Sequence, residues 1–144
     1  MANVTMQKFG WPDTKIAEME HWAVMLRPQQ CTLGALVLAC KQPVTEFGQV
    51  DAAGHAELGR AVTAIETMLK GAVGYQKINY LMLMMVDPDV HFHVLPRYEG
   101  EKSHGGLNVP DAGWPGPPRL DAFAEPDAAA RTALIAHLGA HWPG

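Results

Sequence analysis

The sequence has little of what marks nucleic-acid-binding or membrane-spanning proteins. Among its 144 residues, 11 lysines and arginines are outnumbered by 15 aspartates and glutamates, which gives a formal charge of −4. The basic residues are scattered and form no patch for a phosphate backbone, so we expect no nucleic-acid partner. The longest strongly apolar run, Leu81–Val86, is far shorter than the ~20 residues of a membrane span, so we expect no membrane partner.

Cysteine motifs and export signals are scarce as well. Cys31 and Cys40 are the only cysteines, and their spacing does not match the C-x-x-C motif of zinc ribbons or thioredoxin-like proteins. Residues 1–10 show no basic stretch followed by an apolar run, so we expect no signal peptide. We therefore expect a cytoplasmic protein with reduced thiols. The phosphate-binding motif G-x-x-x-x-G-K-[ST] is absent too.

The pattern along the chain predicts a single domain, residues 1–144, of the α+β class. A helix is expected to start at Asp51, because Leu58, Val62, Ile65 and Leu69 then recur on one helical face. Apolar runs predict an antiparallel sheet of about five strands, at residues 15–19, 21–26, 33–40, 77–86 and 90–98. The remaining segments are an irregular lead-in at 1–14, a Gly/Pro-rich loop at 99–125 and a C-terminal helix at 126–141.

The last two strands, 77–86 and 90–98, are separated by only a short Asp-Pro-Asp segment, which predicts a hairpin. Asp89, His91 and His93 follow at alternate positions, so they are expected to share one face of the second strand. Such a row has three interpretations: a histidine nucleophile, two metal ligands with a carboxylate, or side chains that are solvated or simply hydrogen-bonded in place. Spacing weakens the metal interpretation, because Asp89 and His93 lie roughly 13 Å apart along a strand.

The run His91-Phe92-His93-Val94-Leu95-Pro96-Arg97 resembles the signature of histidine triad proteins, in which His-x-His-x-His is followed by two apolar residues. Its Leu-Pro-Arg ending is similar to the branch of fragile histidine triad proteins and dinucleoside polyphosphate hydrolases, as is the segment Leu33–Val44. The order of strands, long helix and histidine-bearing hairpin also matches the family. The resemblance covers roughly Ile16 to Tyr98.

The resemblance implies a nucleotide-binding phosphohydrolase or nucleotidyl transferase that acts on a phosphate ester, amide or anhydride. His91 would be the nucleophile that carries the nucleotidyl group, and His93 would contact the phosphate. Asn79 and Asp89 would complete the substrate site. Arg97 would either bind phosphate there or brace a loop by pairing with a carboxylate, and we favour the second role. No metal or other cofactor would be required, although a polyphosphate substrate could bring Mg²⁺, and the chain would form a homodimer.

Two departures from the family pattern keep other functions open. Asp89 occupies the position of the first triad histidine, where a carboxylate adds negative charge beside a phosphate site. Met85 and Val86 replace the polar Gln-Ser/Thr pair that usually precedes the triad. The alternatives are a non-catalytic nucleotide-binding module and a metal-dependent hydrolase that uses the His-x-His pair.

Overall fold

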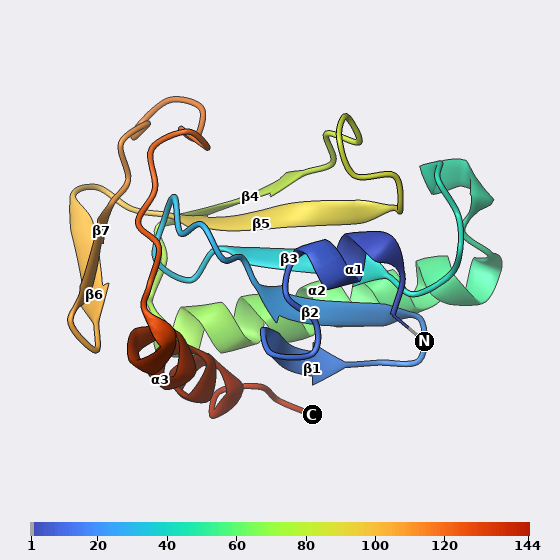
Figure 1. Ribbon diagram of the computed structural model, residues 1–144, viewed down its shortest axis with the longest axis horizontal. Helices are drawn as coiled ribbons and strands as arrows, with labels where there is room; N and C mark the ends of the chain where they lie inside the picture. The colour runs from blue at the N-terminus through green and yellow to red at the C-terminus, as the bar shows by residue number, and fades with distance from the viewer. Residues whose placement is uncertain (1) are drawn as a thin grey trace.

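The computed structural model describes residues 2–144 of the chain (Figure 1). In chain order the elements are α1 (Val4–Lys8), β1 (Lys15–Glu18), β2 (Trp22–Leu26), β3 (Leu36–Cys40), the 3₁₀ turn η1 (Phe47–Gln49), α2 (Ala52–Ala72), β4 (Lys77–Leu81), β5 (His91–Arg97), β6 (Glu101–His104), β7 (Leu107–Pro110) and α3 (Ala128–Gly139). Within the described residues, no helix combines the length and the apolar character that a membrane span needs.

The first five strands form one antiparallel sheet in the order β1-β2-β3-β5-β4. Strands β3 and β5 sit side by side in its middle, and β4 lies at one edge. Strands β6 and β7 form a separate two-stranded ribbon. The predicted α+β class and the five-stranded antiparallel sheet are therefore confirmed.

Helices cover both faces of the sheet, with the long α2 behind it and the short α1 in front (Figure 1). Alternate residues of β2 point to opposite faces, so the two layers draw on different side chains. Trp22 and Leu26 pack with Ile65 and other residues of α2 in the larger core. Met25 packs with Met6 of α1 in a smaller cluster on the other face. The sheet is thus buried on both sides.

Helix α2 begins where the sequence predicted it. Asp51 is its N-cap, with the carboxylate accepting a hydrogen bond from the amide of Gly54 at 2.8 Å. After the helix, Gly74 adopts a left-handed φ of +61°, a conformation that glycine tolerates at helix ends. The C-terminal helix is also present, with Asp127 as its N-cap and Ala128–Gly139 as its body.

Three segments differ from their predictions. The lead-in at 1–14 is not wholly irregular, because it contains α1, whose five residues are too few to show helical periodicity. Strands β4 and β5 pair antiparallel as predicted, but β4 ends at Leu81 instead of residue 86. Residues 82–90 form a long connection, so the predicted short joint of the hairpin is wrong. The loop at 99–125 contains the β6–β7 hairpin, whose turn places Gly105 and Gly106 at positive φ.

Candidate functional site

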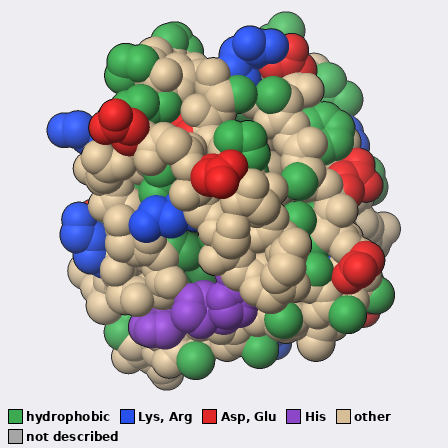
Figure 2. Space-filling view, turned by 90° about the vertical axis from the view of Figure 1, so that its left-hand side faces the viewer, with side chains coloured by type: hydrophobic (Ala, Val, Ile, Leu, Met, Phe, Trp, Pro, Cys, Tyr) green, Lys and Arg blue, Asp and Glu red, His purple; other side chains and the backbone are tan. Residues whose placement is uncertain are grey.

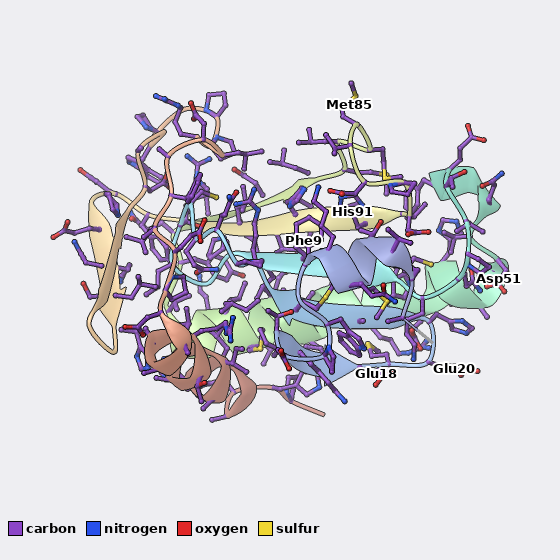
Figure 3. All side chains as sticks on the ribbon, in the orientation of Figure 1. Phe9, Glu18, Glu20, Asp51, Met85 and His91 are labelled. Atoms are coloured by element: carbon purple, nitrogen blue, oxygen red, sulfur yellow. The ribbon has the colours of Figure 1, made fainter. Side chains whose placement is uncertain are left out.

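His91 and His93 lie on the face of β5 that α1 covers. They share this face because they are two residues apart on a strand, as the sequence predicted. Their rings meet edge to face, with centroids 5.2 Å apart. The ring of Phe9, which follows α1, lies 5.9 Å from that of His91 and 5.8 Å from that of His93 (Figure 3). His91 is 2% exposed and His93 is 7% exposed, so both imidazoles are buried.

The backbone fixes which nitrogen of His91 is free. Nδ1 lies 2.7 Å from the carbonyl oxygen of Asp89, and a carbonyl oxygen only accepts hydrogen bonds. Nδ1 must therefore carry the proton, and the neutral ring has its lone pair on Nε2. Among residues 2–144, no side chain or backbone group hydrogen-bonds to that Nε2. His91 thus presents an unprotonated nitrogen that is suited to nucleophilic attack.

His93 has the opposite tautomer because an arginine donates to it. Nε of Arg27 lies 3.3 Å from Nδ1 of His93, and a guanidinium only donates hydrogen bonds. The neutral ring therefore carries its proton on Nε2. Burial lowers the pKa of His93 to about 4, helped by the positive charge of Arg27 and by His91. At neutral pH His93 is an uncharged hydrogen-bond donor.

Asp89 stands in the position of the first triad histidine, but its side chain belongs to α1. One carboxylate oxygen accepts a hydrogen bond from the amide of Thr5 at 3.1 Å, and the amide of Asp89 donates to the hydroxyl of Thr5 at 3.1 Å. Strand β5 begins only at His91, so Asp89 precedes the row of alternating side chains. The structure therefore does not place Asp89 with the histidines as a substrate-binding group.

A cavity of about 450 Å³ opens beside His93 but does not include His91 among its lining residues. Its polar wall carries two cations and two carboxylates, and the remaining wall is largely apolar. The lining residues are Lys8, Phe9, Arg27, Pro28, Gln29, Leu83, Val86, Asp87, His93, Leu120 and Glu125. Lys8 and Asp87 form an ion pair at 2.6 Å across it. The volume falls in the range of small-molecule sites.

Arg97 and Asn79, the other predicted substrate contacts, are engaged with the protein. Two nitrogens of Arg97 bind the two carboxylate oxygens of Asp111 at 2.7 and 3.0 Å. Its remaining donors reach Asn79 Oδ1 at 2.7 Å and the carbonyl of Gly116 at 2.9 Å. These residues lie at the far end of β5 from His91, and Arg97 fixes the loop that contains Asp111, as the favoured sequence interpretation held. The structure thus assigns neither Arg97 nor Asn79 to the histidine cavity.

Among the lining residues, the sequence assigned only His93 to the site, and Arg27, Lys8, Phe9 and Leu120 are among those it missed. Arg27 lies one residue beyond the strand predicted at 21–26, although it follows Met25 by two positions and so continues the face that bears the histidines. Lys8 and Phe9 lie in a segment that was predicted to be irregular, and nothing in their spacing signalled that α1 would fold over β5. Leu120 comes from the long loop at 99–125, which is joined to Gln30 by paired backbone hydrogen bonds at Ala124.

Other histidines gather on the face formed by β6, β7 and α3 (Figure 2). His104 stacks on His137 with centroids 4.2 Å apart, and His141 meets His137 edge-on at 5.2 Å. Nε2 of His137 donates to the carbonyl of Ala72 at 2.8 Å, which ties α3 to the end of α2. None of the three lines the cavity beside His93.

One further cluster, Glu20, His21 and Glu57, brings potential metal ligands close together within the described part of the chain. The carboxylate of Glu57 is already bound by the backbone amides of Glu20 and His21, at 3.1 and 2.6 Å. This arrangement explains the cluster as a brace for the turn between β1 and β2. It does not include His91 or His93.

Comparison with solved structures shows that this chain has the fold of histidine triad proteins. A histidine triad protein from Sinorhizobium meliloti matches over 98% of this chain and 96% of its own, with a TM-score of 0.75 and 19% identity. One from Bradyrhizobium japonicum matches over 99% and 97%, with a TM-score of 0.76 and 18% identity. A hypothetical histidine triad nucleotide-binding protein from Sulfolobus tokodaii matches over 89% and 82%, with a TM-score of 0.66 and 20% identity.

No protein-family model and no curated protein matches the sequence. The likeness is therefore one of fold, and it extends over almost the whole chain in the first two structures.

Proposed function

We propose that this protein binds a nucleotide substrate and transfers its nucleotidyl group to water or another acceptor, through a covalent nucleotidyl-histidine intermediate on His91. The observation that carries the proposal is the hydrogen bond from Nδ1 of His91 to the carbonyl of Asp89, which leaves the lone pair on Nε2. The shared fold with histidine triad proteins, one of them described as nucleotide-binding, supports it.

The reaction has two displacements at phosphorus. In the first, Nε2 of His91 forms a bond to the α-phosphorus while the bond to the leaving group breaks, and the leaving group departs with the electron pair and takes up a proton. In the second, the oxygen of water or another acceptor attacks phosphorus and loses a proton, and the N–P bond returns its electrons to Nε2. His91 is thereby regenerated, and no metal or other cofactor is required. A polyphosphate substrate could bring Mg²⁺ as its own counterion.

Negative charge on the phosphoryl oxygens needs hydrogen-bond donors in the site. His93 supplies one such donor, because its Nε2 carries the proton while Nδ1 accepts from Arg27. Its lowered pKa keeps this donor neutral over the physiological range. Backbone amides complete the set. The side-chain oxygen of Asn79 accepts from Arg97, which leaves only the Asn79 amide nitrogen as a further donor.

Phe9 controls access to the nucleophile. Its ring contacts both histidines, and His91 is 2% exposed beneath it, while the cavity reaches only His93. A substrate that enters this cavity must displace Phe9 before its phosphorus can approach Nε2 of His91. Leu83 and Val86 are among the lining residues, and their apolar surface suits the flat, weakly polar surface of a base.

A non-catalytic nucleotide-binding module is the second candidate. The burial of His91 and the use of Asp89 to hold α1 favour it, because a closed site can bind a ligand at His93 without exposing the nucleophile. The two candidates differ in turnover, and both predict binding.

The test is hydrolysis of an adenosine phosphoramidate and a panel of dinucleoside polyphosphates. Wild type, His91→Ala and the control His55→Ala, which changes an exposed histidine on α2, are each assayed with and without EDTA. We expect turnover that resists EDTA, vanishes in His91→Ala and persists in His55→Ala. Binding without turnover by the wild type would support the non-catalytic module. Turnover that is lost when EDTA is added would support a metal-dependent hydrolase.

We also propose that the protein is a homodimer. Strand β4 is an edge of the five-stranded sheet, so one side of it has no strand partner among the described residues. Sedimentation equilibrium measures the mass directly, and a mass of one chain at micromolar concentration would rule the dimer out.

A further inference from the structure

Arg27 differs from an ordinary buried arginine in what its donors contact. It is 8% exposed, yet no carboxylate among residues 2–144 lies within ion-pair distance of it. Nε donates to Nδ1 of His93 at 3.3 Å, and Nη1 donates to the carbonyl of Gln29. A guanidinium has five donor hydrogens, and Nη2 forms no hydrogen bond within this part of the chain. The side chain is largely buried, but Nη2 is not enclosed by protein and keeps its donors unused.

The unused donors are next to the cavity that opens at His93. Arg27 and Lys8 are both lining residues of that cavity. Lys8 is paired with Asp87, so Arg27 is the cation of this cavity without a counterion among the described residues. A planar guanidinium with free N–H groups matches the oxygens of a phosphoryl group, and charge-assisted bonds of this kind are the strong ones. Glu125 also lines the cavity and forms no ion pair with Arg27 or Lys8 in the described part of the chain. The anion-binding chemistry of the cavity is therefore that of the Arg27 guanidinium beside the imidazole of His93.

The position of Arg27 is fixed by the backbone. Its amide donates to the carbonyl of Ala35 at 2.9 Å, which extends the pairing of β2 with β3 by one step. Its carbonyl accepts from the side chain of Gln30, which is fully buried and also binds the amide of Gly34 and the carbonyl of Ala35. This amide network holds the turn after β2, so the guanidinium is presented from a rigid base.

We propose that Arg27 binds the phosphoryl group of the substrate through Nη2 and, through Nε, positions His93 with its proton on Nε2. The inference rests on the proposed function and assigns the residue that selects a phosphorylated ligand. Binding and positioning are linked in one side chain. A phosphoryl oxygen on Nη2 would then lie next to His93, whose Nε2–H can donate to the same group.

Two variants test the proposal. Arg27→Met keeps much of the length of the side chain without donors or charge, and Arg27→Lys keeps the charge without the planar fork. Arg60→Met removes the same charge from an exposed position on α2 and serves as the matched control. Inorganic phosphate and AMP are titrated calorimetrically into each protein. We expect affinity to fall roughly 10- to 100-fold in Arg27→Met, less in Arg27→Lys, and not at all in Arg60→Met.

The role toward His93 has its own measurement. Long-range ¹H–¹⁵N spectra of the imidazole rings distinguish a proton on Nε2 from one on Nδ1. We expect His93 of the wild type and of Arg60→Met to hold the Nε2–H tautomer, and His93 of Arg27→Met to become a mixture. For any nucleotide that is turned over, kcat should fall together with a rise in KM.

These measurements separate the inference from the proposed function. If no nucleotide is turned over but phosphate affinity and the His93 tautomer depend on Arg27, the inference stands and the covalent mechanism fails. If the wild type does not bind phosphate or AMP, or if Arg27→Met binds them as well as Arg60→Met does and leaves the tautomer unchanged, Arg27 does not have this role. Should Arg27→Met fail to fold, Arg27→Lys decides in the same way.

Discussion

Two buried arginines on the same face of the sheet show how differently this molecule uses one side chain. Arg97 lies at one end of β5 with Asp111, Asn79 and a backbone carbonyl, which engage all three of its nitrogens. Arg27 lies beside His93, at the end of β2, and bonds only to an imidazole and a carbonyl. A buried cation is costly unless it is paired. The charge of Arg97 is paired with a carboxylate of the protein, whereas the charge of Arg27 has no carboxylate partner among the described residues and lies at the edge of a cavity.

The difference distinguishes a bracing group from a binding group without reference to any relative. A guanidinium with all nitrogens satisfied by the protein has nothing to offer a ligand. A guanidinium that is largely buried, is held by a rigid backbone and has few acceptors around it gains from an anion that enters the cavity. Asn79 is intermediate, because its side-chain oxygen accepts from Arg97 while its side-chain amide nitrogen forms no hydrogen bond with a described residue.

The largest expected effect is on stability at the Arg97 end. Arg97→Met should lower the free energy of unfolding by about 3–5 kcal/mol, because it leaves the carboxylate of Asp111, with a side chain only 1% exposed, without its partner. Arg27→Met should lower the free energy of unfolding by only about 1 kcal/mol, since it breaks two hydrogen bonds and leaves no buried carboxylate without a partner. Urea unfolding of the two variants checks the contrast. Equal losses would show that Arg27 is also a structural group.

A smaller effect is expected from the titration of His93. The folded pKa of His93 is about 4, below the ordinary value of ~6.5, so the unfolded chain takes up a proton first as pH falls. Unfolding free energy should therefore drop by roughly 1–3 kcal/mol between pH 6.5 and pH 4 because of His93. The quantity to measure is the difference between wild type and His93→Gln across that window, since carboxylates titrate in both. A difference that stays constant with pH would contradict the lowered pKa. In Arg27→Met, which lacks the nearby positive charge, the pH-dependent change in the difference should be smaller.

The smallest effect is expected where α1 meets β5. Asp89→Ala removes the carboxylate that binds the amide of Thr5 and should cost about 1 kcal/mol, as the loss of a helix cap does. Reaction of His91 with diethylpyrocarbonate, followed by mass spectrometry, should accelerate in Asp89→Ala and in Phe9→Ala, because both loosen the cover over the ring. Unchanged modification in both variants would mean that α1 does not limit access to His91.

The fold could be predicted from the sequence where periodicity was strong. The stripe from Leu58 to Leu69 gave α2, and the alternation around His91 and His93 placed both rings on one face. The prediction was wrong where an apolar run did not mean a strand, as at Met85 and Val86, which are 84% and 81% exposed in the loop after β4. Figure 3 shows Met85 at the tip of that loop, away from His91.

The candidate site was predicted only in part, because most of its wall comes from contacts between distant segments. Thr5 and Asp89 are 84 positions apart, and no local pattern couples a short helix near the N-terminus to the start of β5. Arg27 carried a weak signal, since it continues the alternation of β2 beyond the last apolar residue. The roles expected for Asn79, Asp89 and Arg97 depended on position in a motif, and their hydrogen bonds to other residues became visible only in three dimensions.

The pairing of Thr5 with Asp89 also has a consequence for the order of folding. A helix of five residues is not stable by itself, so α1 can form only after β5 has brought Asp89 into place. It is then the last element to dock and the first to detach, and its opening costs less free energy than global unfolding. In native-state hydrogen exchange, the amides of α1 should exchange before those of β3 and β5. His91 would thus become accessible through a partial unfolding event that leaves the sheet intact.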